Sequence, residues 1–187
     1  MQALSAQPPR WGCCVQGAGD AEDHTFWEIP GLTSLENGLE LNKPIICAVN
    51  GPAVGFGCTV VAACDFVIAS ERATFSFPEV RIGVPTIQGS VRLPGKIGWQ
   101  NAAELLMIGE AVDAHRGKEM GLVKDVVPHE ELMPAARALA ERLVLSAPLA
   151  VRAVKEVMRR GQSMPFTDAS ENAQAHAHPQ PISDAHL

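Results

Sequence analysis

Apolar runs alternate with turn residues through the middle of the chain, and they predict short buried strands joined by helices. Residues 45–49 form an apolar run of strand length that ends in turn residues. Residues 58–64 contain no helix breaker and follow a glycine-containing loop, which favours a short buried helix. Residues 66–69 form a second strand. A strand, a helix and a strand in so few residues predict a right-handed crossover in a parallel sheet.

The second half of the chain is predicted to be mainly helical. Residues 74–77 form one more short strand, and residues 78–98 are rich in Gly and Pro, which predicts a long structured loop of the kind that lines sites. Asp113 is a predicted helix N-cap. The remaining predicted elements are a strand at 123–127 and helices at 99–108, 114–120, 130–145 and 149–160. The fold class is therefore α/β with a C-terminal helical region.

Composition divides the chain into four segments. Residues 1–42 are rich in Gly, Pro and acidic residues, and we expect an irregular lead-in that ends in one short helix. Residues 43–128 hold the predicted strands and form the core, and residues 129–175 are C-terminal helices. Residues 176–187 are a polar tail.

Length and charge exclude several classes of protein. With 187 residues, 47% of them hydrophobic, the chain can bury one substantial core. Its net charge is −6 and it has no run of Lys or Arg, which argues against nucleic acid as a partner. No apolar window is long enough for a membrane span, and the first ten residues lack a signal core. We therefore expect a soluble, cytoplasmic protein that does not bind membranes.

The cysteines and histidines do not form a recognisable metal or redox site. The five cysteines are an odd number, and three of them lie in apolar segments where Cys acts as a small hydrophobic residue. Cys13 and Cys14 are adjacent and lack CxxC spacing. His176 and His178 lie in the polar tail, which we expect to be disordered. We predict reduced thiols and no bound metal.

The segment 54–58 is the first candidate site. Its residues place three successive backbone N–H groups at the opening of the predicted helix, where no intrahelical carbonyl can accept them. Gly55 and Gly57 let a ligand approach the backbone, and the donors suit a negative oxygen. The alternative is that both glycines only permit close packing of helix on strand.

Glu79 is the best candidate for an acid/base group. It follows a proline and has the apolar neighbours Phe77 and Val80. Apolar surroundings disfavour the charged carboxylate, which suits a group that takes and returns a proton near neutral pH. The alternative is an exposed glutamate at a strand end.

Two other enzyme classes fit the sequence less well. A strand, a GxG turn and a later Glu71 resemble part of a Rossmann nucleotide-binding fingerprint, but Val60 replaces its third glycine and Pro52 precedes the turn. A serine hydrolase would need a GxSxG elbow, which the chain lacks.

Four blocks of sequence point to a known family, and they are residues 43–51, 55–58, 63–69 and 77–83. In order and spacing they resemble the crotonase superfamily, the enoyl-CoA hydratase/isomerase family, and the similarity extends to about residue 175. The resemblance implies a spiral of ββα turns, with residues 43–128 as a crotonase-like core and residues 129–175 as an oligomerisation region. It also implies a homo-oligomer, a trimer or a hexamer of two trimers.

The resemblance further implies a lyase or isomerase of fatty acid metabolism that binds an acyl-CoA thioester, with coenzyme A as part of the substrate and no separate cofactor. The thioester oxygen would lie in an oxyanion hole between two backbone N–H groups, one of them from Phe56 beside Gly55 and Gly57. Glu79 matches the acid/base glutamate of the family.

The chain departs from the family pattern at several points. Thr59 replaces the second glutamate of the hydratases, and its hydroxyl cannot take a proton from water near pH 7. One base suffices for double-bond isomerisation. The first oxyanion donor is not recognisable, and the chain looks truncated at both ends, so we expect an incomplete crotonase spiral. A non-catalytic member that binds acyl-CoA, or only forms oligomers, is the alternative function.

Overall fold

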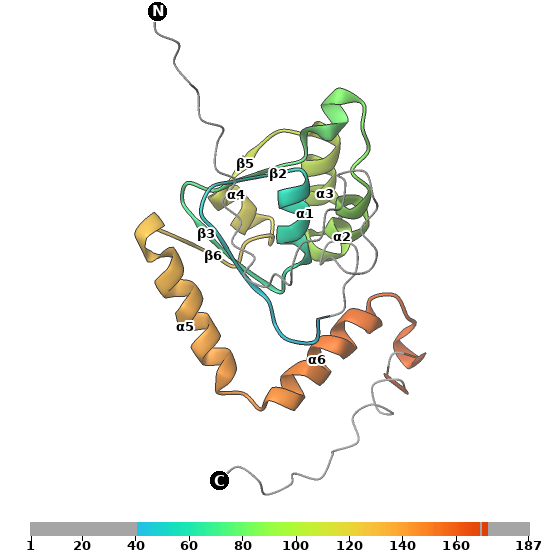
Figure 1. Cartoon of the computed structure of the whole chain (residues 1–187). Helices are drawn as coiled ribbons and strands as arrows, with labels where there is room; N and C mark the ends of the chain where they lie inside the picture. The colour runs from blue at the N-terminus through green and yellow to red at the C-terminus, as the bar shows by residue number, and fades with distance from the viewer. Residues whose placement is uncertain (1–40, 169, 172–187) are drawn as a thin grey trace, which may run out of the picture.

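The computed structural model describes residues 41–168 and 170–171 (Figure 1). The predicted lead-in helix, Cys13, Cys14 and the polar tail lie outside these residues. Two small sheets and the helices around them form the described part of the chain. The first sheet contains β1 (Ile46–Val49), β3 (Phe66–Ser70) and β6 (Asp125–Val127), in the order β1-β3-β6. All its pairings are parallel, as predicted for the first two strands.

The strands of the second sheet lie between those of the first along the chain. It has the order β2-β4-β5, with β2 (Pro52–Val54), β4 (Thr74–Ser76) and β5 (Val112–Asp113). β2 and β4 are parallel, while β5 runs antiparallel to β4. The chain thus runs β1, β2, α1 and then β3, β4, so that each turn contributes one strand to each sheet. This repeat is the expected ββα spiral.

Helices cover the sheets and connect their strands (Figure 1). Asp113 caps α4 as predicted, accepting a hydrogen bond from Arg116 N at 2.7 Å. In chain order the helical elements are α1 (Phe56–Ala63), the 3₁₀ helix η1 (Pro78–Ile82), α2 (Ile87–Ile97), α3 (Trp99–Ala103), the π-helix η2 (Glu104–Ile108), α4 (Ala114–Glu119), the 3₁₀ helix η3 (His129–Glu131), α5 (Leu132–Val144) and α6 (Pro148–Gly161).

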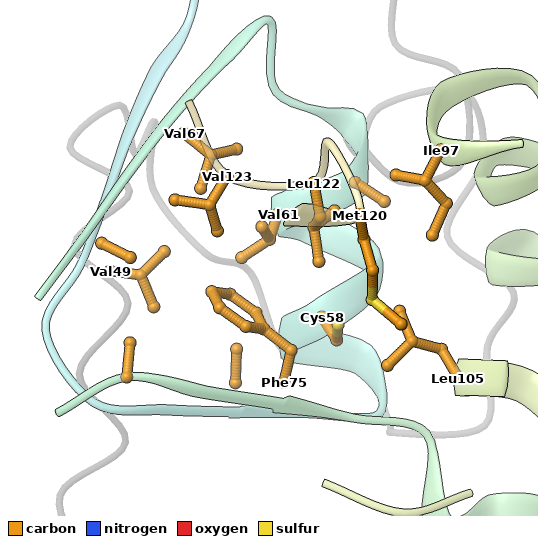
Figure 2. Packing of buried hydrophobic residues seen from close by; sticks show 14 of the residues in the cluster. Val49, Cys58, Val61, Val67, Phe75, Ile97, Leu105, Met120, Leu122 and Val123 are labelled. Atoms are coloured by element: carbon orange, nitrogen blue, oxygen red, sulfur yellow. The ribbon is translucent and has the colours of Figure 1, made fainter. Parts of the chain in front are cut away.

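The strands of the first sheet are mostly apolar, with Ser70 and Asp125 as the exceptions, because both faces of this sheet are covered. Side chains alternate between the faces, so Val67 and Ala69 of β3 enter the main core while Ile68 packs under α5 with Leu132. The main core lies between the two sheets, and Figure 2 shows Phe75 and Cys58 within it. Cys47, Cys58 and Cys64 are buried and form no disulfide.

The predicted loop over residues 78–98 is wrong, because this segment contains η1 and the eleven-residue helix α2. Proline lacks the N–H of a regular helix position, so Pro94 argues against a helix in the sequence. Burial outweighs this cost. Leu93 and Ile97 are buried, and a Cβ at Gly89 would lie 2.9 Å from a ring carbon of Phe77. The apolar face of α2 is therefore fixed by contacts distant in sequence.

In an ordinary amphipathic helix the apolar side faces the core, whereas in α6 the apolar side faces solvent. Its apolar stripe, which consists of Ala150, Val154, Val157 and Met158, is exposed. Its polar side faces the core, where Lys155 Nζ donates to Asp65 Oδ2 at 2.6 Å and to the Lys43 carbonyl at 2.8 Å. An ion pair, rather than the apolar stripe, joins α6 to the sheet. Within residues 41–168 and 170–171, the helices are too short or too polar to cross a bilayer.

Candidate active site

The parallel pairing of β2 with β4 creates the site. Val54 lies opposite Ser76 at the ends of these strands, and parallel strands end at the same edge of a sheet. The chain continues from β2 into Gly55 and α1, and from β4 into η1. Gly55 N–H donates to the Ser76 carbonyl at 2.8 Å, which fixes the two continuations side by side.

Glu79 packs directly against Gly55. Gly55 has φ +54° and ψ −112°, a conformation that favours glycine. A Cβ at this position would lie 3.2 Å from Glu79 Cδ and would clash with Glu79 Oε1. The missing side chain of Gly55 is thus what lets the carboxyl group reach the opening of α1.

The Glu79 side chain is half-buried, and its Oε2 atom is buried without a hydrogen-bond partner in the described part of the chain. A buried carboxyl oxygen normally has a partner, so an open one indicates a position where a ligand completes the contacts. Its backbone is held firmly, because Val84 N–H donates to the Glu79 carbonyl at 3.0 Å. This geometry suits a group that exchanges a proton with a ligand above Gly55.

The first turn of α1 presents free donors beside this carboxyl group. Thr59 N–H, which donates to the Gly55 carbonyl at 3.0 Å, makes the first hydrogen bond of the helix. The N–H groups of Phe56 and Gly57 have no acceptor among the described residues. Phe56 itself is 66% exposed, so the opening of α1 lies at the surface. An anionic oxygen could approach both donors.

Thr59 is buried beside the first turn of α1. Its side chain is 4% exposed, and its hydroxyl donates to the Gly55 carbonyl at 3.3 Å. The hydroxyl proton is therefore used in a hydrogen bond to the helix backbone. Within the described ranges, Phe56, Gly57 and Glu79 therefore present groups without a partner at the turn, whereas the Thr59 hydroxyl is bonded to the Gly55 carbonyl.

Cys58 lies beneath the same turn and is fully buried. Burial raises the pKa of its thiol to about 12, against the opposing effect of a backbone hydrogen bond with Ser76. The charge of Glu79 also raises this pKa, and that of Lys96 lowers it. A neutral thiol with no exposed surface packs in the core and is a poor nucleophile.

Residues without a recognisable motif hold the acid/base group in place. Arg81 Nε donates to the Ile108 carbonyl at 3.1 Å, and its guanidinium pairs with Glu110 at 2.9 Å, which ties η1 to the end of η2. Gly109 permits this contact, because a Cβ there would lie 2.8 Å from Val80 Cγ1. Sequence periodicity cannot reveal such long-range contacts.

A cleft of about 250 Å³ lies beside η1, α2 and α3. Val80 and Met107 line it together with Pro85, Thr86 and Trp99, and its walls carry no charged residue. Among residues 41–168 and 170–171, no three His, Cys, Asp or Glu side chains gather as a metal ion would require.

The chain also matches the sequence profile of one family, and this match agrees with the site and with the ββα spiral. The enoyl-CoA hydratase/isomerase profile matches residues 15–187, which is most of the chain. The chain belongs to this family. Membership in the enoyl-CoA hydratase/isomerase family argues against the two alternatives, a Rossmann nucleotide-binding protein and a serine hydrolase.

Curated relatives and solved structures agree with the assignment to the enoyl-CoA hydratase/isomerase family. The chain is 39% identical over 159 residues to carnitinyl-CoA dehydratases of Citrobacter koseri and Salmonella agona, covering 84% of this chain and 60% of each relative. An enoyl-CoA hydratase of Bacillus anthracis superposes with a TM-score of 0.72 at 34% identity, covering 78% of this chain and 58% of that one. For an enoyl-CoA hydratase/isomerase of Cupriavidus metallidurans the TM-score is 0.70 at 34% identity, with 76% and 56% covered. The chain thus spans about three fifths of the length of these relatives.

Proposed function

We propose that this protein acts on an acyl-CoA thioester as an enoyl-CoA hydratase/isomerase-type enzyme. In this proposal the N–H groups of Phe56 and Gly57 bind the thioester oxygen, and Glu79 transfers the proton. The observation that carries the proposal is the position of the Glu79 carboxyl group against Gly55, with a buried oxygen that has no partner. Donors and base then face the same small volume.

The proposed chemistry passes through an enolate. Removal of a proton from the carbon next to the thioester carbonyl places negative charge on the carbonyl oxygen, where the free amides of α1 stabilise it. The Glu79 carboxylate takes that proton and can return it to another carbon of the acyl chain. The amides at a helix opening also lie at the positive end of the helix dipole, which favours the developing charge.

The position of Thr59 bears on which reaction follows. Its hydroxyl is engaged with the Gly55 carbonyl and cannot serve as a second base. One carboxylate is sufficient for moving a double bond, so isomerisation fits these residues more simply than hydration. Coenzyme A would enter as part of the substrate, and no separate cofactor is needed for either reaction.

Turnover of crotonyl-CoA and of a 3-enoyl-CoA tests the proposal. We expect Glu79→Gln to lower kcat at least about hundredfold, because the amide cannot accept a proton. Glu141→Gln is the matched control, since Glu141 is an exposed carboxylate on α5. It should change kcat less than about twofold.

The same assay separates the second candidate function, a non-catalytic member that binds acyl-CoA. The engagement of Thr59 with its own helix is the observation that favours it. If wild type and Glu79→Gln give the same background rate while calorimetry detects acyl-CoA binding, the protein is a binding module. Loss of both binding and turnover would contradict both candidates.

A further inference from the structure

Lys96 reaches from α2 to the far end of the helix that opens onto the candidate site. Its ammonium group donates to the Ala62 carbonyl at 3.1 Å and to the Cys64 carbonyl at 2.5 Å, and it lies 3.5 Å from the Val61 carbonyl oxygen. Val61 and Ala62 lie in the last turn of α1 and Cys64 is its C-cap, a region where most helix carbonyls lack intrahelical donors, although the Val61 carbonyl also accepts from Cys64 N–H at 3.2 Å. Lys96 therefore caps the C-terminal end of α1.

The charged form of Lys96 matches this environment. An ammonium group has three donors and no acceptor, and three carbonyl oxygens surround it. Burial is the largest effect and lowers the pKa of Lys96, and the charge of Arg92 acts in the same direction, while the negative charge of Asp65 opposes both. A helix C-terminus carries partial negative charge, which favours a cation there.

The charge of Lys96 extends along α1 to its first turn. An eight-residue helix is about 12 Å long, and α1 is largely buried, so solvent screens only part of the interaction. The effect of Lys96 on the Cys58 thiol supports this, because Cys58 is in the first turn beside Gly57. A cation at one end of the helix thus adds positive potential at the other.

We propose that Lys96 is a positioning residue for the oxyanion-binding turn: it fixes the C-terminal end of α1 and adds its charge to the amides of Phe56 and Gly57. This inference rests on the proposed function and adds a residue outside the contact site. Lys96 touches no substrate atom in this scheme. It acts only through the helix and its field.

The size of the effect follows from Coulomb's law. At an effective dielectric constant of about 20, the interaction between two unit charges about 12 Å apart changes an equilibrium or rate constant roughly tenfold. Because Lys96 is half-buried and an enolate spreads its charge, we expect a three- to tenfold loss of kcat when the charge is removed. Because the ground-state thioester is neutral, KM should change less than about twofold.

Three substitutions separate charge from packing. Lys96→Met removes charge and donors, Lys96→Gln keeps donors without charge, and Lys96→Arg keeps both. Lys124→Met, which removes an exposed cation elsewhere, is the matched control. We expect kcat to fall in the Met and Gln variants, to recover in the Arg variant and to stay unchanged in the control.

A spectroscopic measurement tests Lys96 without relying on turnover. The infrared carbonyl stretch of bound butyryl-CoA, labelled with ¹³C at the thioester carbon, reports how strongly the turn polarises the carbonyl group. In Lys96→Gln this stretch should move back toward its value in free solution, and Lys96→Arg should restore the wild-type position. An unchanged stretch in folded Lys96→Gln, or an Arg variant as impaired as the Gln variant, would overturn the proposal.

Failure of the proposed enzyme activity and failure of the proposed role of Lys96 give different experimental results. If the wild type turns over neither enoyl substrate, but its bound butyryl-CoA has a shifted stretch that moves back in Lys96→Gln and is restored in Lys96→Arg, the proposed enzyme is contradicted and the role of Lys96 is supported. Normal turnover with no difference between wild type and Lys96→Gln contradicts the role of Lys96 alone.

Discussion

Gly55 meets two independent requirements at one position. The turn from β2 into α1 needs its positive φ, and the Glu79 carboxyl group occupies the space where a side chain would begin. Either requirement alone would favour glycine. Together they explain why the carboxyl group and the free amides can lie so close.

Replacing Gly55 by Ala should therefore damage both stability and activity. The strained backbone costs about 1–3 kcal/mol of unfolding free energy. The new Cβ would displace Glu79, and kcat should fall at least about hundredfold. Gly51→Ala is the control, because a Cβ at Gly51 meets nothing within 4 Å. Urea denaturation and turnover measure the two effects, and equal behaviour of both variants would contradict the argument.

The residues of the candidate site could be singled out from the sequence, while their arrangement could not. Gly55 and Phe56 are marked by a helix opening after a strand, and Glu79 by a carboxylate among apolar neighbours. That Glu79 reaches Gly55 depends on the pairing of Val54 with Ser76, which are far apart in sequence. Lys96 lies in a Gly- and Pro-rich segment and carries no motif, so only the recognition of α2 as a helix could reveal it.

At the scale of elements, local signals predicted most strands and helices. The N-cap Asp113 and the apolar runs of β1 and β3 required no tertiary information. Helix α2 was missed because its Pro and Gly content opposes a helix, and its stability comes from Leu93 and Ile97 in the core. Propensity is a weak guide where burial of one face decides.

The ion pair between Lys155 and Asp65 should stabilise the attachment of α6. The two side chains are 15% and 28% exposed, and Asp65 Oδ2 also accepts from Ile45 N–H at 2.7 Å. Lys155→Met should lower the unfolding free energy by about 1–2 kcal/mol. Lys118→Met, which breaks a pair whose members are about half exposed, should cost at most about 0.5 kcal/mol. Equal losses in urea denaturation would show that burial of the pair is unimportant.

The pair between Glu104 and Arg116 links η2 to α4 and should make stability depend on pH. A hydrogen bond from Arg116 lowers the pKa of Glu104. A carboxyl group whose pKa is lowered on folding stabilises the protein above its ordinary pKa of about 4.3, and this stabilisation is lost as pH falls through the lowered value.

We therefore expect Glu104→Gln to flatten the acid limb of the stability curve. Between about pH 5 and pH 3 the wild type should lose more unfolding free energy than the variant, and the difference should shrink in high salt because the pair is partly exposed. Denaturation at several pH values measures it. A steeper acid limb in Glu104→Gln would contradict the assignment.

For the whole molecule, the sequence predicted the ββα spiral but not the orientation of α6. The apolar stripe of α6 has ordinary amphipathic spacing, which favours packing on the core of the same chain. The structure instead exposes Val154 and Met158, at 57% and 66%. Spacing identifies a stripe but cannot specify which surface covers it.

We propose that another copy of the chain covers the α6 stripe, in line with the homo-oligomer that the family resemblance implies. Burying each large apolar side chain of the stripe contributes about 1.5–3 kcal/mol. Met158→Glu should therefore raise the dissociation constant of the assembly at least about tenfold, as measured by analytical ultracentrifugation. Arg152→Glu, which lies off the stripe, is the control. A wild type that stays monomeric at high concentration would contradict the expectation.

The burial of Cys58 under the first turn of α1 supplies a natural reporter for movement at this position. Alkylating reagents attack thiolates, so they reach Cys58 only when the turn lifts away from the core and water enters. The labelling rate of the Cys58 peptide, measured by mass spectrometry, would then report how often the turn opens. Any molecule that fastened the turn would slow the labelling, whether or not a reaction followed.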